Sequence, residues 1–175
     1  MKDLIKKCIN GDRLAQKELY LQHCDLLMKI AWRYTKDIDH AQDVVQDAFV
    51  RIFHALDSFD ESKAPLVTWM KTICIREAIG FLRKHKKFNW TDELSENLLS
   101  TDEELMAGEW DTEEILLRIE SLSDEHKTIL MLYYFDELSH KEIAALLNIK
   151  EVSSRSRLLR AREILKIRWK VAFIF

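Results

Sequence analysis

Residues that bend a chain sharply are scarce in this sequence, because only three glycines and one proline occur among its 175 residues. Sandwiches and barrels connect many short strands by tight turns, which depend on these two residue types. Leucine, isoleucine, lysine, glutamate and arginine dominate instead, as they do in helical proteins. The sequence therefore predicts an all-α fold, and its length allows one domain or two small ones.

No segment of the sequence predicts a membrane span or a secretory signal. No stretch reaches the roughly 18 to 20 uninterrupted apolar residues that cross a bilayer, and the opening residues MKDLIKKCINGD lack the apolar core of a signal peptide. We therefore expect a cytoplasmic protein that does not insert into membranes. Its cysteines, Cys8, Cys24 and Cys74, are widely spaced and are expected to be reduced and buried.

Motifs for catalysis or cofactor binding are not found in the sequence. The six histidines have no metal-ligand spacing, and neither a glycine-rich phosphate loop nor a nucleophile motif occurs. We expect no metal, no cofactor and no enzymatic activity.

Charges are segregated along the chain, although the formal net charge is only −3. Residues 1–87 carry 16 basic and 12 acidic side chains, whereas residues 88–114 carry ten acidic and no basic ones. The basic side chains gather further in two runs, 71–87 and 150–170. One such run alone is equally well explained as a solvated helix face, but two separate runs favour a long polyanion as partner.

Apolar spacing predicts three long helices in the first 87 residues, with a short leading helix before them. Asp12 is expected to cap a helix that ends near Lys36. Asp39 with Gln42 forms a second capping signature, for a helix that ends near Leu56.

A loop and a third helix are expected to complete this lobe. Residues 57–65 are typical of a loop, and Pro65 suits the first turn of a helix that runs from Leu66 into the basic cluster. The acidic connector that follows is interpreted either as an extended strap bound in a basic groove or as a loose linker whose Trp90 and leucines rest on a neighbouring lobe.

The second lobe is expected to contain four short helices, at about residues 113–121, 124–135, 140–147 and 154–169. Ser123 is a plausible N-cap, Ser139 with Glu142 forms a capping box, and Asn148 is suited to end a helix in the left-handed conformation. The last two helices are separated by a short bend, which predicts a helix-turn-helix.

The final helix offers side chains that suit the major groove of DNA. Ser154, Leu158, Ala161 and Leu165 are spaced to face the core, so the opposite side is expected to carry the base-reading candidates Arg155, Ser156, Leu159 and Arg160. The candidates for phosphate contacts are Arg157, Arg162 and, at the start of the preceding helix, Lys141. A solvated arginine face remains the alternative.

Five strings resemble bacterial sigma factors of the extracytoplasmic-function (ECF) type, the two-domain promoter-recognition subunits of RNA polymerase. DIDHAQDVVQDAFVRIFHALDSF (37–59), TWMKTI (68–73) and FLRKHKK (81–87) are similar to region two of that family. LSDEHKTILMLYYFDELSHKEIAALLNI (122–149) and SRSRLLRAR (154–162) are similar to region four. The resemblance implies three parts: a domain at 1–87 for polymerase binding and the minus-ten element, an acidic linker at 88–111, and a domain at 112–175 for the minus-thirty-five element.

The same resemblance implies that Asp43, Gln46 and Asp47 grip the coiled coil of the largest polymerase subunit. These side chains stand three and four residues apart and can offer carboxylates to a basic partner. The acidic linker resembles the segment that family members thread through a polymerase channel. Core RNA polymerase and promoter DNA are thus the implied partners, and an anti-sigma inhibitor is left open.

A minus-ten surface is implied on the loop before the third helix and on that helix itself. Family members open the duplex there and hold an unstacked base, which needs a stacking wall, polar edges and basic flanks. The matching residues are Phe59, Ser62, Lys63, Arg76, Arg83 and Lys84. Arg76 stands where close relatives often have asparagine, and Trp69 is interpreted as a core residue rather than a stacking platform.

Two further departures from the family pattern fall in the second lobe. Glu137 replaces a glycine that is usual in the turn before SHKEI, and Val152 with Ser153 replaces Gly-Thr before the last helix. Valine is poor at positive φ, so we expect that turn to adopt a different local conformation. The apolar ending RWKVAFIF is expected either to pack on the lobe or to contact an inhibitor.

Two functions from different classes explain the sequence. The first is a promoter-specificity factor that binds core polymerase through the first lobe and DNA through both. The alternative is a stand-alone regulator in which only the helix-turn-helix acts and the first lobe dimerises.

Overall fold

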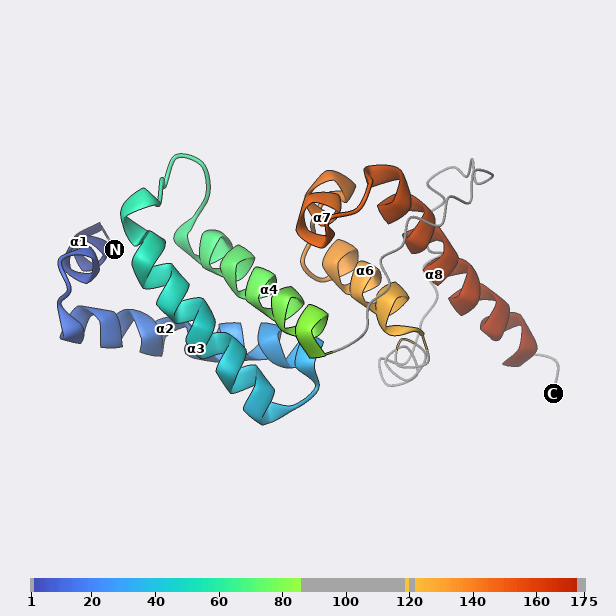
Figure 1. Cartoon of the computed structure of the whole chain (residues 1–175), viewed down its shortest axis with the longest axis horizontal. Coiled ribbons are helices and arrows are strands. Elements are labelled where there is room, and N and C mark those ends of the chain that lie inside the picture. The colour runs from blue at the N-terminus through green and yellow to red at the C-terminus, as the bar shows by residue number, and fades with distance from the viewer. Residues whose placement is uncertain (1, 86–118, 120–121, 173–175) are drawn as a thin grey trace. The chain divides into compact units, whose positions relative to one another are not determined.

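The computed structural model describes residues 2–85, 119 and 122–172, with side chains described as far as residue 165. All regular structure in these ranges is helical (Figure 1), so the predicted all-α fold is confirmed. The chain divides into two compact units, residues 1–87 and 88–175. The connector 88–111 and the helix expected at 113–121 lie outside the described residues, apart from Ile119, which is helical and buried. Among the described helices, none is both long and apolar enough to cross a bilayer.

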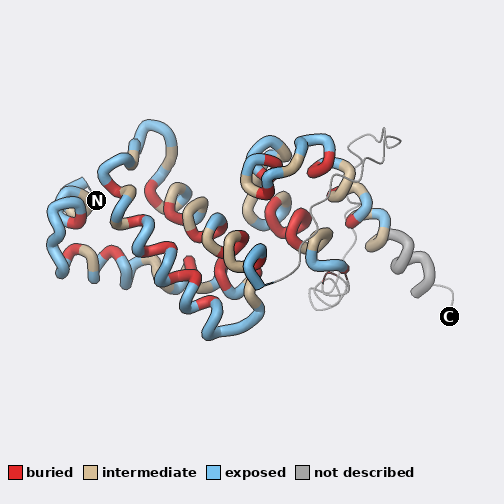
Figure 2. Tube along the Cα trace, viewed as in Figure 1, coloured by how far each residue is buried: buried red, intermediate tan, exposed pale blue. Residues whose placement is uncertain are grey.

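The first unit is built on three long helices that pack against one another. These are α2 (Arg13–Thr35), α3 (Ile38–Ala55) and α4 (Leu66–His85), with the short α1 (Lys2–Ile9) against α2. Their inner faces bury side chains such as Leu27, Ile52 and Met70, which are almost fully removed from solvent. Buried positions recur along all three helices (Figure 2). Burial of aliphatic side chains on all three helices is the main source of stability in this unit.

Two of the helix starts in this unit differ in how well the sequence predicted them. Asp12 caps α2 as predicted, because its Oδ1 accepts hydrogen bonds from the backbone N–H groups of Leu14 at 2.9 Å and Ala15 at 3.2 Å. The cap predicted at Asp39 is wrong, since Asp37 caps α3 by accepting from the N–H of His40 at 2.9 Å. Left-handed Lys36 (φ 57°) turns the chain within a single residue, so α3 begins earlier than expected.

The loop before α4 begins with the 3₁₀ turn η1 (Leu56–Ser58). Pro65 does not enter the first turn of α4 as predicted, but lies at the N-cap position, where its carbonyl accepts from the N–H of Trp69 at 3.1 Å. Proline loses nothing at this position, because an N-cap N–H has no helical acceptor. Cys8 and Cys74 form no disulfide among the described residues and are buried as predicted, whereas Cys24 is only half-buried.

The second unit contains α6 (Asp124–Tyr134), α7 (His140–Leu147) and α8 (Glu151–Ala172), which pack around buried Ile129, Leu132, Ile143, Leu147 and Leu158. The predicted caps are confirmed: Ser123 precedes α6, Ser139 and Glu142 form a capping box, and Asn148 ends α7 with φ 55°.

The last helix begins three residues before its predicted start. The N–H of Ser154 donates to the carbonyl of Lys150 at 3.1 Å, so Glu151, Val152 and Ser153 already belong to the first turn. Val152 is helical and avoids a positive φ, which agrees with the altered turn expected from its side chain.

Glu137 is held in the left-handed region with φ 55°, although it is neither glycine nor asparagine. We expect Glu137→Gly to stabilise the second unit by about 0.5 to 1 kcal/mol, because glycine removes this strain but is more disordered in the unfolded chain. Amide hydrogen exchange in α6 and α7 measures the effect. Asn148→Gly is the control: because asparagine tolerates φ 55°, this substitution should change the stability of the unit little. A loss of stability in Glu137→Gly would contradict the prediction.

Candidate functional site

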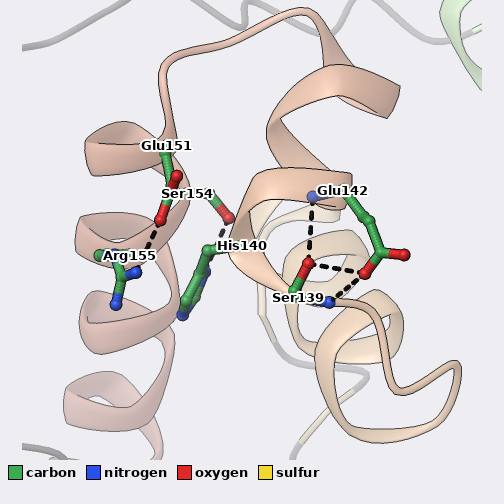
Figure 3. Close-up of polar contacts among 6 residues, drawn as sticks. All are labelled: Ser139, His140, Glu142, Glu151, Ser154 and Arg155. Atoms are coloured by element: carbon green, nitrogen blue, oxygen red, sulfur yellow. Dashed lines mark hydrogen bonds and ion pairs between the residues drawn. The ribbon is translucent and has the colours of Figure 1, made fainter.

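The bend between α7 and α8 is held by side chains at the start of α7. Ser139 donates to Oε2 of Glu142 from its N–H at 2.8 Å and from its hydroxyl at 2.6 Å (Figure 3). These bonds hold the pKa of Glu142 below its usual value. The next residue, His140, places Nδ1 2.9 Å from the hydroxyl of Ser154 on α8 and stacks on Tyr133 of α6. All three helices therefore meet at the predicted helix-turn-helix.

Helix α8 separates a packing face from a polar face. Ser154, Leu158 and Ala161 are buried, as predicted, whereas Leu165 is only half-buried. The base-reading candidates lie outside this buried set: Arg155 and Arg160 are exposed, and Ser156 and Leu159 are half-buried. A helix with buried small and aliphatic residues on one side and arginines on the other has the polarity needed to lie in the major groove.

The candidates for phosphate contacts divide into two kinds. Lys141 is exposed in the first turn of α7, whereas Arg157 and Arg162 are half-buried. Arg162 donates from Nε to the hydroxyl of Tyr134 at 2.8 Å, and its guanidinium lies over the Tyr133 and Tyr134 rings at 5.8 and 5.5 Å. Arg162 therefore joins α8 to α6 in this structure.

His126 at the start of α6 lies close to the arginines of α8. Burial lowers the pKa of His126, and the positive charges of Arg160 and Arg157 lower it further, against the opposite effect of Glu125. Its Nδ1 lies 2.9 Å from the hydroxyl of Ser123, the N-cap of α6. The lowered pKa favours the uncharged imidazole beside these arginines.

Two residues in the first turn of α8 were missed from the sequence. Val152 exposes 69% of its surface, and Glu151 forms an ion pair with Arg155 at 2.6 Å. Both lie beside the base-reading candidates, at the N-terminal end of α8, and in known recognition helices the N-terminal residues are the ones that contact base edges. The acidic Glu151 was the available signal, because acidic residues favour the first turn of a helix.

A groove of about 1030 Å³ runs between α3 and α4 in the first unit. Its α3 wall includes Asp43, Gln46 and Asp47, the three residues predicted to bind polymerase. Its α4 wall includes Arg76 and Lys84, which were predicted to contact the minus-ten element. The fold thus brings the whole polymerase-binding set and two members of the minus-ten set to one groove, whose walls carry charges of both signs.

Arg51 of α3 and Glu77 of α4 form an ion pair within this groove. Trp69 also lines it and is half-buried, so the interpretation of Trp69 as a core residue is wrong. Its ring centroid lies 5.3 Å from that of Phe59 on the preceding loop. Two neighbouring aromatic rings, one of which lines the groove, are suited to stack a base.

The loop beside these rings is shaped by Asp60. Ser62 donates to Oδ1 of Asp60 from its hydroxyl at 2.7 Å and from its N–H at 3.0 Å, and Lys63 Nζ lies 3.6 Å from Oδ2. These bonds hold the pKa of Asp60 below its usual value. Ser62 and Lys63 are exposed, and Arg83 is exposed in the last turn of α4.

Family models match both units of the chain. Sigma-70 region 2 matches residues 19–88, and Sigma-70 region 4 matches residues 112–165. The ECF RNA polymerase sigma factor SigM of Bacillus subtilis (strain 168) is 32% identical over 151 residues, which cover 85% of this chain and 91% of SigM. The ECF RNA polymerase sigma-E factor of Escherichia coli (strain K12) is 30% identical over 172 residues, which cover 91% of this chain and 89% of the relative.

Solved structures with a similar fold have lower identity. The sigma factor RpoE of Bartonella quintana, in complex with the anti-sigma factor NepR, has a TM-score of 0.55 at 24% identity, over 89% of this chain and 96% of the other. CnrH in complex with the cytosolic domain of CnrY has a TM-score of 0.53 at 21% identity, over 96% of both chains. A match that spans both units does not favour the alternative of a stand-alone regulator. The chain belongs to the ECF-type sigma factors of RNA polymerase.

Proposed function

We propose that this sigma factor directs promoter-specific initiation through two surfaces: the α3–α4 groove and the polar face of α8. The observation that carries the proposal is the division of α8, whose buried Ser154, Leu158 and Ala161 leave Arg155 and Arg160 exposed. In this proposal α8 lies in the major groove of the minus-thirty-five element. Arginine donates two hydrogen bonds to O6 and N7 of guanine, serine bonds to a base edge, and leucine contacts a thymine methyl.

Contacts to the DNA backbone set the position of α8 without reading sequence. Lys141, exposed at the start of α7, is suited to this role. Arg157 and Arg162 are proposed to contribute positive charge while they also pack within the lobe. The hydrogen bond between His140 and Ser154 then holds α8 in position against α7.

Polymerase binding is proposed for the acidic wall of the α3–α4 groove. Asp43, Gln46 and Asp47 are all exposed, and apolar residues next to them in the sequence, such as Val45 and Ala48, are buried. This leaves the carboxylates available for basic side chains of a partner. The coiled coil of the largest polymerase subunit is the proposed partner, by analogy with the family.

The minus-ten element is proposed to contact the loop before α4 and the basic wall of the same groove. Phe59 supplies a stacking surface beside Trp69, and Ser62 and Lys63 supply polar and basic groups on the ordered loop. Arg76, Arg83 and Lys84 supply positive charge along α4 for a single strand.

Catalysis is proposed to belong to the polymerase, and this subunit to supply promoter recognition and opening in the cytoplasm. Both similar structures contain a second protein: CnrH is in complex with the cytosolic domain of CnrY, and the sigma factor RpoE is in complex with the anti-sigma factor NepR. We propose that an inhibitory protein of this kind is a further partner of this chain.

Reversing one charge tests polymerase binding. Asp47→Arg is expected to weaken co-elution with core RNA polymerase and promoter-dependent run-off transcription by at least about tenfold, because like charges placed together at an interface are strongly unfavourable. Asp25→Arg, an equal charge change at an exposed position on α2, serves as the control and should leave both unchanged. Unchanged co-elution and transcription with Asp47→Arg would refute the assignment.

Base reading is tested by truncating the exposed arginines. Arg155→Ala or Arg160→Ala is expected to cost about 1 to 3 kcal/mol on the preferred upstream element and to relax specificity at one base pair. Binding of holoenzyme to promoters with single base-pair changes measures this. Lys141→Ala is the comparison, since loss of a phosphate contact weakens binding evenly across sequences. Even weakening by the arginine variants would assign them to phosphates instead.

A further inference from the structure

An acidic residue in the first turn of α8 contacts one of the proposed base readers. Oε1 of Glu151 lies 2.6 Å from Nη2 of Arg155, one turn further along the helix (Figure 3). The short distance indicates a charge-assisted hydrogen bond. A glutamate four residues before a basic residue also has the favourable order for such a pair on a helix.

This ion pair contributes little to the stability of the fold. The Glu151 and Arg155 side chains are 43% and 58% exposed, and exposed pairs add little to the free energy of unfolding. Its main consequence is the direction of the Arg155 guanidinium. That group has five N–H donors, and the bond engages one of its nitrogen atoms, so donors remain for a base edge.

The helix that carries the pair is itself held in place. Ser154, next to Arg155, is fully buried and bonded to His140. Glu151 is favoured in the first turn of α8 by the positive end of the helix dipole. Both partners of the ion pair therefore start from defined backbone positions.

We propose that Glu151 is a positioning residue that orients Arg155 before DNA binds and so sharpens base discrimination in the upstream element. This inference rests on the proposed function of α8. An arginine without such a carboxylate partner loses side-chain entropy when it is ordered on a base. On a wrong sequence, its guanidinium can turn to a phosphate instead. An arginine that a carboxylate already orients loses less side-chain entropy on the correct base, and it is less able to change its contact on a wrong base.

The test uses holoenzyme assembled from the full chain and core RNA polymerase, bound to promoters with a randomised upstream element. The base pair read by Arg155 is the one whose preference is lost in Arg155→Ala. Glu151→Ala is expected to reduce the preference at that pair by about two- to tenfold. It should also raise affinity for unrelated sequences, because one negative charge near the phosphates is removed. In the Arg155→Ala background, Glu151→Ala should not change the preference further.

Controls separate the positioning role from a general charge effect. Glu163→Gln removes a charge from an exposed position of the same helix and should leave the preference intact. An unchanged preference in Glu151→Ala would overturn the positioning role while leaving base reading by Arg155 in place. A loss of preference at a different base pair, equal in both Arg155 backgrounds, would also overturn it, since Glu151 would then read a base itself. If Arg155→Ala altered no preference, both the inference and the proposed role of Arg155 would fail.

Discussion

The hydrogen bond between His140 and Ser154 is the contact on which the proposed DNA-reading surface depends. Ser154 is fully buried, and a buried hydroxyl without a partner is costly, so the 2.9 Å contact to Nδ1 of His140 favours one placement of α8 against α7. His140 is itself placed by the capping box that begins α7 and by stacking on Tyr133. The arginines one and six residues beyond Ser154 are thereby presented from a defined helix, which base reading requires.

In the first unit, the groove between α3 and α4 combines charges of opposite sign. The exposed acids Asp43 and Asp47 on α3 and the basic Arg76 and Lys84 on α4 line the same groove, and Arg51 and Glu77 pair within it. Acidic side chains there suit a basic protein partner and repel DNA, whereas the basic ones do the reverse. The groove therefore offers groups for partners of either charge.

Local signals in the sequence predicted most of the fold. Helix periodicity, the caps at Asp12 and Ser139, and the left-handed Asn148 involve residues within a few positions of one another, so sequence spacing is enough to identify them. The errors arose where two local signals competed. Asp37 and Asp39 are both acceptable caps, and the left-handed Lys36 decided between them. The start of α8 was placed too late because Val152 was assigned to the turn, and this excluded Glu151 from the candidate site.

Contacts between distant residues could not be predicted from spacing. Arg162 and Tyr134 are 28 residues apart, and only the packing of α8 on α6 brings them together. The shared groove of Asp47 and Arg76 likewise depends on how α3 crosses α4. Residue types at these positions indicated charge and hydrogen-bonding capacity, but the fold determined which of them are neighbours.

We propose that this chain acts within the polymerase by placing α8 on DNA while α3 contacts the enzyme. Photo-crosslinking of holoenzyme on a promoter tests it directly, with a photoreactive residue in place of Gln46 in one sample and Leu159 in another. We expect position 159 to crosslink to the upstream promoter element and position 46 to crosslink to the largest polymerase subunit. Crosslinks from position 159 to polymerase alone, or from position 46 to DNA alone, would contradict it.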